Sequence, residues 1–192
     1  HDRFIGSLIG FMRQFDRFTG EDVCCTTNEC YSMDPPWNST TRPVPAPRCR
    51  VRMNILFRIY TRSNPDYPFN ATARNISVVG SPYDPKKPTI IIFHGWMNTS
   101  NFESVKPLIE AYLACADVNV VMVDYSSITA NTSYAQAVSD IRLVARQASR
   151  FVRYLTDELG ASPGNIHLVG TSLGAHAASY VGKYFPGLGK IT

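Results

Sequence analysis

The sequence predicts an α/β fold in which a mostly parallel sheet carries helices on both faces. Residues 88–93 and 118–123 are apolar except for Thr89 and Asn119, which is typical of strands buried on both faces of a sheet. A long amphipathic helix is expected between the second of these strands and a third apolar run at residues 166–169. Because a strand, a helix and another strand in this order form a right-handed βαβ unit, we expect these strands to be parallel.

The third strand is followed at once by a G-x-S-x-G motif and then by a helical pattern of apolar residues. This order is the context of the nucleophile elbow of α/β-hydrolases, in which Ser172 would be exposed to a base. Gly170 and Gly174 are expected where the turn leaves no room for a Cβ atom. The N–H of Leu173, at the positive end of the helix, is an expected oxyanion donor. The flanking strand and helix argue against a chance motif in an ordinary turn.

The N-terminal residues 1–22 are predicted to be an extension, and residues 23–192 the N-terminal part of a hydrolase domain. Residues 3–18 carry apolar side chains at helical spacing, so we expect an amphipathic helix. Three roles fit such a helix: lying on a lipid interface, acting as a pro-segment, or packing on the domain. No apolar stretch approaches transmembrane length.

Residues 24–50 are rich in Pro, Ser and Thr, and we expect a loop that depends on disulfides for order. Residues 51–60 alternate apolar and polar side chains, which predicts a strand. An exposed loop follows, and residues 76–79 are predicted to form a second, short strand.

The strand at residues 88–93 leads directly into His94-Gly95-Trp96. A glycine straight after a buried strand, with an aromatic residue next, is suited to presenting a backbone N–H in a pocket. A helix is expected at residues 102–115, with Asn101 as a cap candidate and Glu103 in its acidic first turn.

The best predicted helix opens with a capping box formed by Ser133 and Gln136, and Gly160 ends it. Its roughly 26 residues would span ~39 Å, which is enough to cross a sheet.

Sequons and cysteines indicate a secreted protein. Five cysteines, four of them clustered early, indicate disulfides, and the odd count leaves one thiol free or paired outside the chain. No cysteine–histidine set has zinc spacing, so no metal site is expected. The five N-x-S/T sequons are candidate glycosylation sites: Asn38, Asn70, Asn75, Asn98 and Asn131. The net charge of +4 comes without a basic run interleaved with aromatic residues, which argues against a nucleic-acid partner.

The motifs follow one another as in one known family. The early cysteines, the Pro36-Trp37 loop, the strand ending in His94-Gly95-Trp96, the strand ending in Asp124-Tyr125 and the serine motif occur in the order found in pancreatic-type lipases. Residues 23–192 resemble this family, and the pancreatic triacylglycerol lipase branch is the closest likeness.

The resemblance implies an α/β-hydrolase fold and hydrolysis of carboxylic esters at a lipid–water interface. It implies Ser172 as the nucleophile and the backbone N–H groups of Trp96 and Leu173 as the oxyanion hole. It also implies a disulfide between Cys24 and Cys30. It gives no partner for the other three cysteines: Cys25, Cys49 and Cys115.

The resemblance places the catalytic Asp and His, the lid and any calcium-binding segment beyond residue 192. We therefore expect the chain to be the N-terminal piece of a longer lipase, with no cofactor of its own. His94 is expected to brace its loop, His167 to lie below the site, and His176 to pack along the elbow helix. His1 lies in the tail, and Asp124 is expected to be non-catalytic.

The favoured function is therefore that of a secreted triacylglycerol lipase whose partner is a lipid surface; a colipase-like partner is left undefined. A phospholipase A1 of the same fold is one alternative. A catalytically inactive lipid-binding or storage relative is another, although the intact serine motif argues against it.

Overall fold

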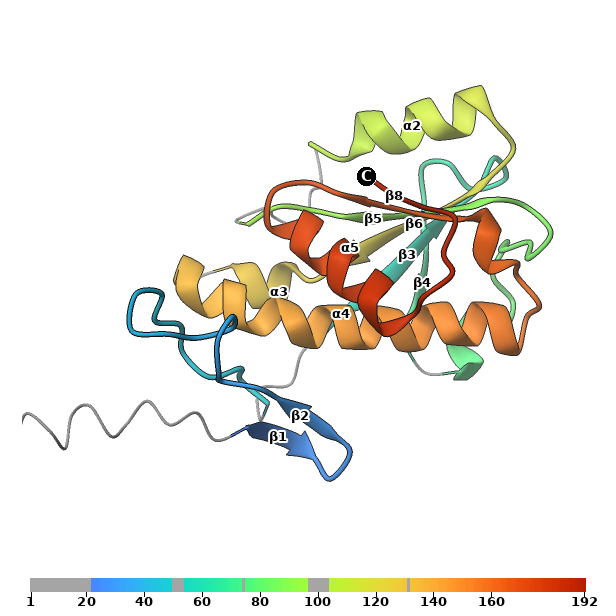
Figure 1. The fold of residues 1–192 in the computed structure, drawn as a ribbon. Coiled ribbons are helices and arrows are strands. Elements are labelled where there is room, and N and C mark those ends of the chain that lie inside the picture. Colours follow the sequence, from blue (N-terminus) through green and yellow to red (C-terminus); the bar gives the residue numbers. More distant parts are fainter. Residues whose placement is uncertain (1–21, 50–53, 74, 97–103, 131) are drawn as a thin grey trace, which may run out of the picture.

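The computed structural model describes residues 22–49, 54–73, 75–96, 104–130 and 132–192. Its centre is a six-stranded sheet with the order β4-β3-β6-β5-β7-β8 (Figure 1). The strands of this sheet are β3 (Leu56–Tyr60), β4 (Phe69–Ala71), β5 (Thr89–Phe93), β6 (Asn119–Asp124), β7 (Ile166–Gly170) and β8 (Lys190–Ile191). β5 runs parallel to both β6 and β7, and β8 is parallel to β7. β3 is antiparallel to both β6 and β4, so the predicted mostly parallel sheet is confirmed and has an antiparallel edge.

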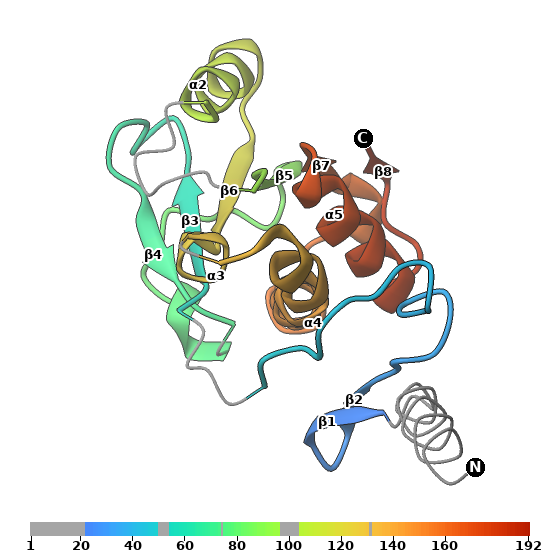
Figure 2. The same ribbon diagram turned by 90° about the vertical axis from the view of Figure 1, so that its left-hand side faces the viewer.

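Helices cover both faces of the sheet, which explains why Ile90–Phe93 of β5 and Val120–Val123 of β6 are apolar without interruption. On one face, α2 (Lys106–Cys115) packs on Ile92 and Met122. On the other, α4 (Tyr134–Asp157) and α5 (Leu173–Tyr184) cover the alternate residues, which include Phe93. Figures 1 and 2 show α2 on one side of the sheet and α4 with α5 on the other.

The long helix predicted from periodicity is α4, with 24 residues. The Ser133 side chain accepts a hydrogen bond from the Gln136 N–H at 3.3 Å, as a cap should. The reciprocal half of the predicted capping box is absent, because the Gln136 amide donates instead to the Ala46 carbonyl and to Asp140. After the helix, Gly160 takes a positive φ of 78°.

The predicted irregular loop at residues 24–50 begins as a hairpin of β1 (Val23–Thr26) and β2 (Glu29–Tyr31). The expected disulfide between Cys24 and Cys30 closes this hairpin. A second disulfide joins Cys25 to Cys49, a pairing that the sequence had left open, and Cys115 is free and exposed. Residues 32–49, which we call the strap, run from the hairpin past α5 and along α4 (Figure 2).

The strand predicted at residues 76–79 is wrong. The chain forms the 3-10 helix η2 (Asn75–Val78) there, because the Ser77 hydroxyl accepts from the Thr72 N–H and donates to the Thr72 carbonyl. These bonds fold the segment back on itself, and β4 pairs with β3 instead. Four further short elements were not predicted, namely β4, β8, α3 (Ser126–Thr129) and η3 (Pro163–Asn165).

Several predictions lie outside the described residues. They are the helix at residues 3–18, the start of the strand at residues 51–53, and the start of the helix at residues 102–103 with its cap candidate Asn101. The division between residues 22 and 23 stays a prediction. Within the described part of the chain, no helix combines the length and apolarity that crossing a membrane requires.

Candidate active site

The turn between β7 and α5 has the geometry of a nucleophile elbow. β7 ends at Gly170, and α5 begins at Leu173 with Ser172 as its N-cap residue. Ser172 has φ 54° and ψ −120°, and it is the only non-glycine residue with a positive φ in the described part of the chain. Such a conformation costs about 1–3 kcal/mol, so the surrounding structure must hold it in place.

Backbone contacts around the turn supply that constraint. The Thr171 N–H donates to the Phe93 carbonyl of β5 at 3.1 Å, and the Gly174 N–H donates to the Thr171 carbonyl at 2.9 Å. A Cβ atom on Gly174 would lie 2.2 Å from the Phe93 carbonyl oxygen, and one on Gly170 would lie 2.5 Å from the Ala175 Cα. Both positions therefore exclude any side chain.

The elbow exposes Ser172 to solvent and places the N-terminus of α5 directly beside it. Ser172 is exposed, whereas the Leu173 side chain is fully buried and anchors the first turn of α5. The Leu173 N–H belongs to the first turn of the helix, where backbone donors have no acceptor within the helix. The positive end of the helix dipole lies at the same place.

The loop after β5 lies against the elbow. A Cβ atom on Gly95 would be 3.5 Å from the Ser172 Cβ, which places the Gly95 backbone beside the serine. Trp96 follows, 36% exposed, and its ring meets that of Tyr134 edge-on with centroids 5.3 Å apart. Sequence reasoning did not place Tyr134 beside this loop, because the contact joins segments that lie far apart in the sequence.

His94 fixes the path of this loop from beneath. It is almost fully buried and stacks on Tyr125 with ring centroids 3.8 Å apart. Its Nδ1 lies 2.8 Å from the Gly95 carbonyl, its Nε2 accepts from the Tyr125 N–H, and the Tyr125 hydroxyl donates to the His94 carbonyl. Burial lowers the pKa of His94, which favours the neutral ring.

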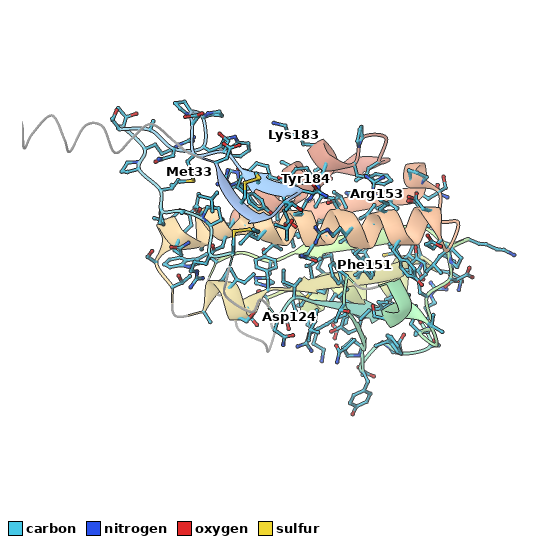
Figure 3. All side chains as sticks on the ribbon, turned by 90° about the horizontal axis from the view of Figure 1, so that it is seen from below. Met33, Asp124, Phe151, Arg153, Lys183 and Tyr184 are labelled. Atoms are coloured by element: carbon cyan, nitrogen blue, oxygen red, sulfur yellow. A yellow bond between two sulfur atoms is a disulfide. The ribbon has the colours of Figure 1, made fainter. Side chains whose placement is uncertain are left out.

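Asp124 and His167 are engaged elsewhere. Asp124 accepts two hydrogen bonds from the Arg58 guanidinium, at 2.7 and 3.0 Å, and two from Ser126. Figure 3 shows Asp124 on the side of the molecule away from Tyr184 of α5. His167 Nε2 lies 2.9 Å from the Thr192 hydroxyl.

His176 is exposed on α5, one turn beyond Ser172. No hydrogen bond joins the Ser172 hydroxyl to a histidine within the described ranges. The same residues contain no group of three or more His, Cys, Asp or Glu side chains able to hold a metal ion.

Comparison of the whole sequence with known protein families agrees with this structure, which has the elbow, the helix that follows it and the parallel sheet. The sequence model of the Lipase family matches residues 21–192. This chain belongs to the lipase family. The resemblance to pancreatic-type lipases is thereby confirmed.

Curated relatives of this lipase chain cover most of it. Human pancreatic triacylglycerol lipase is 33% identical over 176 residues, which is 90% of this chain and 38% of that protein. Pancreatic lipase-related protein 2 of Myocastor coypus is 32% identical over 177 residues, or 90% of this chain and 37% of that protein. The lipase chain thus spans less than two fifths of the length of these relatives.

Among solved structures, the butyrate-bound esterase Est2 of Thermogutta terrifontis matches 74% of the lipase chain. The match covers 43% of that chain, with 20% sequence identity and a TM-score of 0.43.

Two of the lipase chain's sequons have described side chains. Asn70 is exposed on β4, an edge strand of the sheet. Asn38 is partly buried in the strap, and its side-chain oxygen accepts from the Val44 N–H at 3.1 Å. The other three asparagine side chains, those of Asn75, Asn98 and Asn131, lie outside the described part.

Proposed function

We propose that the protein containing this chain is a secreted triacylglycerol lipase that works through a serine nucleophile. The observation that carries the proposal is the conformation of Ser172, which is exposed, strained and fixed between two positions that only glycine fits. Strain of this kind persists at functional sites, where it holds a reacting group in place. A protein that only binds lipid gains nothing from it.

In the proposed reaction, the Ser172 hydroxyl attacks the ester carbonyl carbon and loses its proton to a histidine. The oxyanion that forms accepts hydrogen bonds from the N–H groups of Leu173 and Trp96. The alcohol then leaves with the proton from that histidine, and water hydrolyses the acyl-enzyme by the same route in reverse. We propose that this histidine and its Asp partner come from outside residues 1–192, because His94 and His167 already have other partners and His176 lies on the elbow helix itself, one turn beyond the serine.

The substrate class is proposed from the relatives and from the surface beside the serine. Several relatives are named as pancreatic triacylglycerol lipases, among them those of human and mouse. The exposed rings of Trp96 and Tyr134 lie next to the elbow and offer apolar surface to an acyl chain. Two disulfides in the N-terminal segment support secretion, because such bonds persist in oxidising compartments.

The test is to assay the full-length protein on emulsified triacylglycerol and on phosphatidylcholine, beside a Ser172→Ala variant. We expect Ser172→Ala to lower triacylglycerol hydrolysis by more than about 10⁴-fold. Ser179→Ala is the matched control, because Ser179 is exposed on the same helix and its hydroxyl bonds only the Ala175 carbonyl.

Each outcome separates the alternatives. Faster hydrolysis of phosphatidylcholine than of triacylglycerol would replace the proposal with a phospholipase A1. Lipid binding without hydrolysis, or an unchanged rate in Ser172→Ala, would remove the serine mechanism.

A further inference from the structure

A cavity of about 250 Å³ lies between the strap and the first turns of α4 and α5. Trp37 and Val44 of the strap form one wall, Val138 of α4 a second, and Tyr180 of α5 a third. Figure 2 shows the strap passing alongside these two helices. Leu173 also lines the cavity, so it adjoins the elbow without including Ser172.

The charged groups that line the cavity are cationic. Arg42 of the strap and Arg142 of α4 both line it, whereas none of its described lining residues is Asp or Glu. Arg142 is 4% exposed, and its guanidinium carbon lies 5.0 Å from the centroid of the Trp37 ring. It donates to the Ser32 carbonyl at 2.7 Å, which fixes its position.

The electrostatic setting of the cavity favours an anion. Burial lowers the pKa of Arg142, which shows that its charge is poorly solvated. Tyr180 lines the cavity together with both arginines, and burial raises its pKa while the charges of Arg142 and Arg42 oppose that rise. An anion among them would accept hydrogen bonds from fixed donors.

We propose that this cavity binds the carboxylate end of a short- or medium-chain fatty acid. The guanidinium groups of Arg42 and Arg142 hold the carboxylate, and the rings of Trp37 and Tyr180 cover the first part of the chain. The volume suits a small ligand, since pockets for drug-sized molecules are larger, about 300–1,000 Å³. The binding stands on the cavity alone, whereas the identity of the acid as a product of Ser172 rests on the proposed function.

The test is calorimetric titration of the full-length Ser172→Ala protein with octanoate, 1-octanol and acetate. We expect octanoate to bind at least about tenfold more tightly than either of the others, because the site needs both charge and chain. Arg42→Gln should weaken octanoate binding by about tenfold or more. Arg62→Gln is the control, since Arg62 is also an exposed arginine but donates to Leu113 and Ala114 at the end of α2.

A second variant guards against an indirect effect of the charge change. Val44→Trp fills the cavity from the strap and should abolish octanoate binding. Equal affinity for octanoate and 1-octanol, or unchanged octanoate binding in both Arg42→Gln and Val44→Trp, would overturn the proposal. Because the serine is already absent, failure of the hydrolase assay and failure of the titration are separate results.

Discussion

Ser172 holds a conformation that folding would avoid if stability alone mattered. A glycine tolerates its φ of 54° without steric cost, although it adds about 0.5–1 kcal/mol of conformational freedom to the unfolded chain. Since the strain of a non-glycine residue is about 1–3 kcal/mol, we expect Ser172→Gly to be about 1 kcal/mol more stable than Ser172→Ala. Urea unfolding of both variants measures the difference. Equal stability would mean that the turn is not strained.

The second residue-scale prediction concerns the glycine that contacts β5. A methyl group at position 174 would meet the backbone oxygens of both Phe93 and His94, at 2.2 and 2.6 Å, and neither can move without shifting β5. We expect Gly174→Ala to lower the free energy of unfolding by about 3 kcal/mol or more. At Gly164 a new Cβ would find only Ser162 Oγ at 3.8 Å, so Gly164→Ala should change stability by less than about 0.5 kcal/mol. A mild effect at position 174 would show that β5 and the elbow can separate.

The distance along the sequence between interacting residues explains which parts of the site could be predicted. The elbow lies within five consecutive residues between a strand and a helix, so its motif and its context are both visible in the chain. The partners of His94 and Asp124 are different. Tyr125 is 31 residues from His94, and Arg58 is 66 residues from Asp124, and only the pairing of β5, β6 and β3 brings them together.

The same difference between local patterns and contacts of distant residues holds for whole helices and strands. α4 was predictable because its apolar face repeats over many turns, and the βαβ unit follows from it. The hairpin of β1 and β2 has strands of four and three residues, too short for a periodic signal, and its geometry depends on a disulfide. η2 was mistaken for a strand because its apolar residues alternate, whereas its conformation is set by Ser77 bonding back to Thr72.

The strap is fixed to α4 by a buried ion pair. Asp140 is fully buried, and it accepts from the backbone N–H of Arg48 at 2.8 Å and from its Nε at 2.6 Å. Replacing Arg48 by Met keeps the backbone bond but leaves the carboxylate without a charge partner. We expect a loss of about 2–3 kcal/mol, less than for a fully buried pair because Arg48 is partly exposed.

The matched control for that prediction is an exposed pair on α2. Lys106 and Glu110 lie 3.7 Å apart and both are well exposed. Lys106→Met should therefore change the free energy of unfolding by less than about 0.5 kcal/mol. Similar losses for Lys106→Met and Arg48→Met would contradict the buried-pair account.

The two disulfides close loops of different length, so their contributions to the free energy of unfolding can be compared. Cys24–Cys30 spans a sequence separation of 6 and Cys25–Cys49 one of 24. Loop-closure entropy in the unfolded chain then gives stabilisations of about 2 and about 3.5 kcal/mol. Replacing Cys25 and Cys49 together by Ser should cost about 1 kcal/mol more than replacing Cys24 and Cys30. The reverse order in thermal or urea unfolding would show that the hairpin, rather than the strap, limits stability.

At the scale of the whole molecule, β5 connects the parts of the proposed site. It lies between β6 and β7, it ends at the His94–Trp96 loop, and its Phe93 carbonyl accepts from the elbow. The strap closes the opposite side of α4 and α5, so the elbow helix is held between the sheet and a disulfide-linked segment. Stability and the geometry of the proposed site therefore depend on the same contacts.

Because His94 lies at that junction, its protonation is linked to the stability of the fold. Burial lowers the pKa of His94 below its ordinary value of 6.5, so at lower pH the unfolded chain binds a proton that the folded chain does not. The stabilisation is complete above pH 6.5 and is lost as the pH falls from there through the folded pKa. The slope is at most about 1.4 kcal/mol per pH unit for one proton.

The measurement is the free energy of unfolding at several pH values between 8 and 5 for wild type, His94→Gln and His167→Gln. We expect His94→Gln to flatten most of the decline below pH 6.5. Burial, together with Lys190, also lowers the pKa of His167, but this ring is more exposed, so His167→Gln should remove only a small part. A decline that persists in His94→Gln would show that other groups cause it. The neutral ring that accepts from the Tyr125 N–H would then not be the link between pH and the stability of the fold.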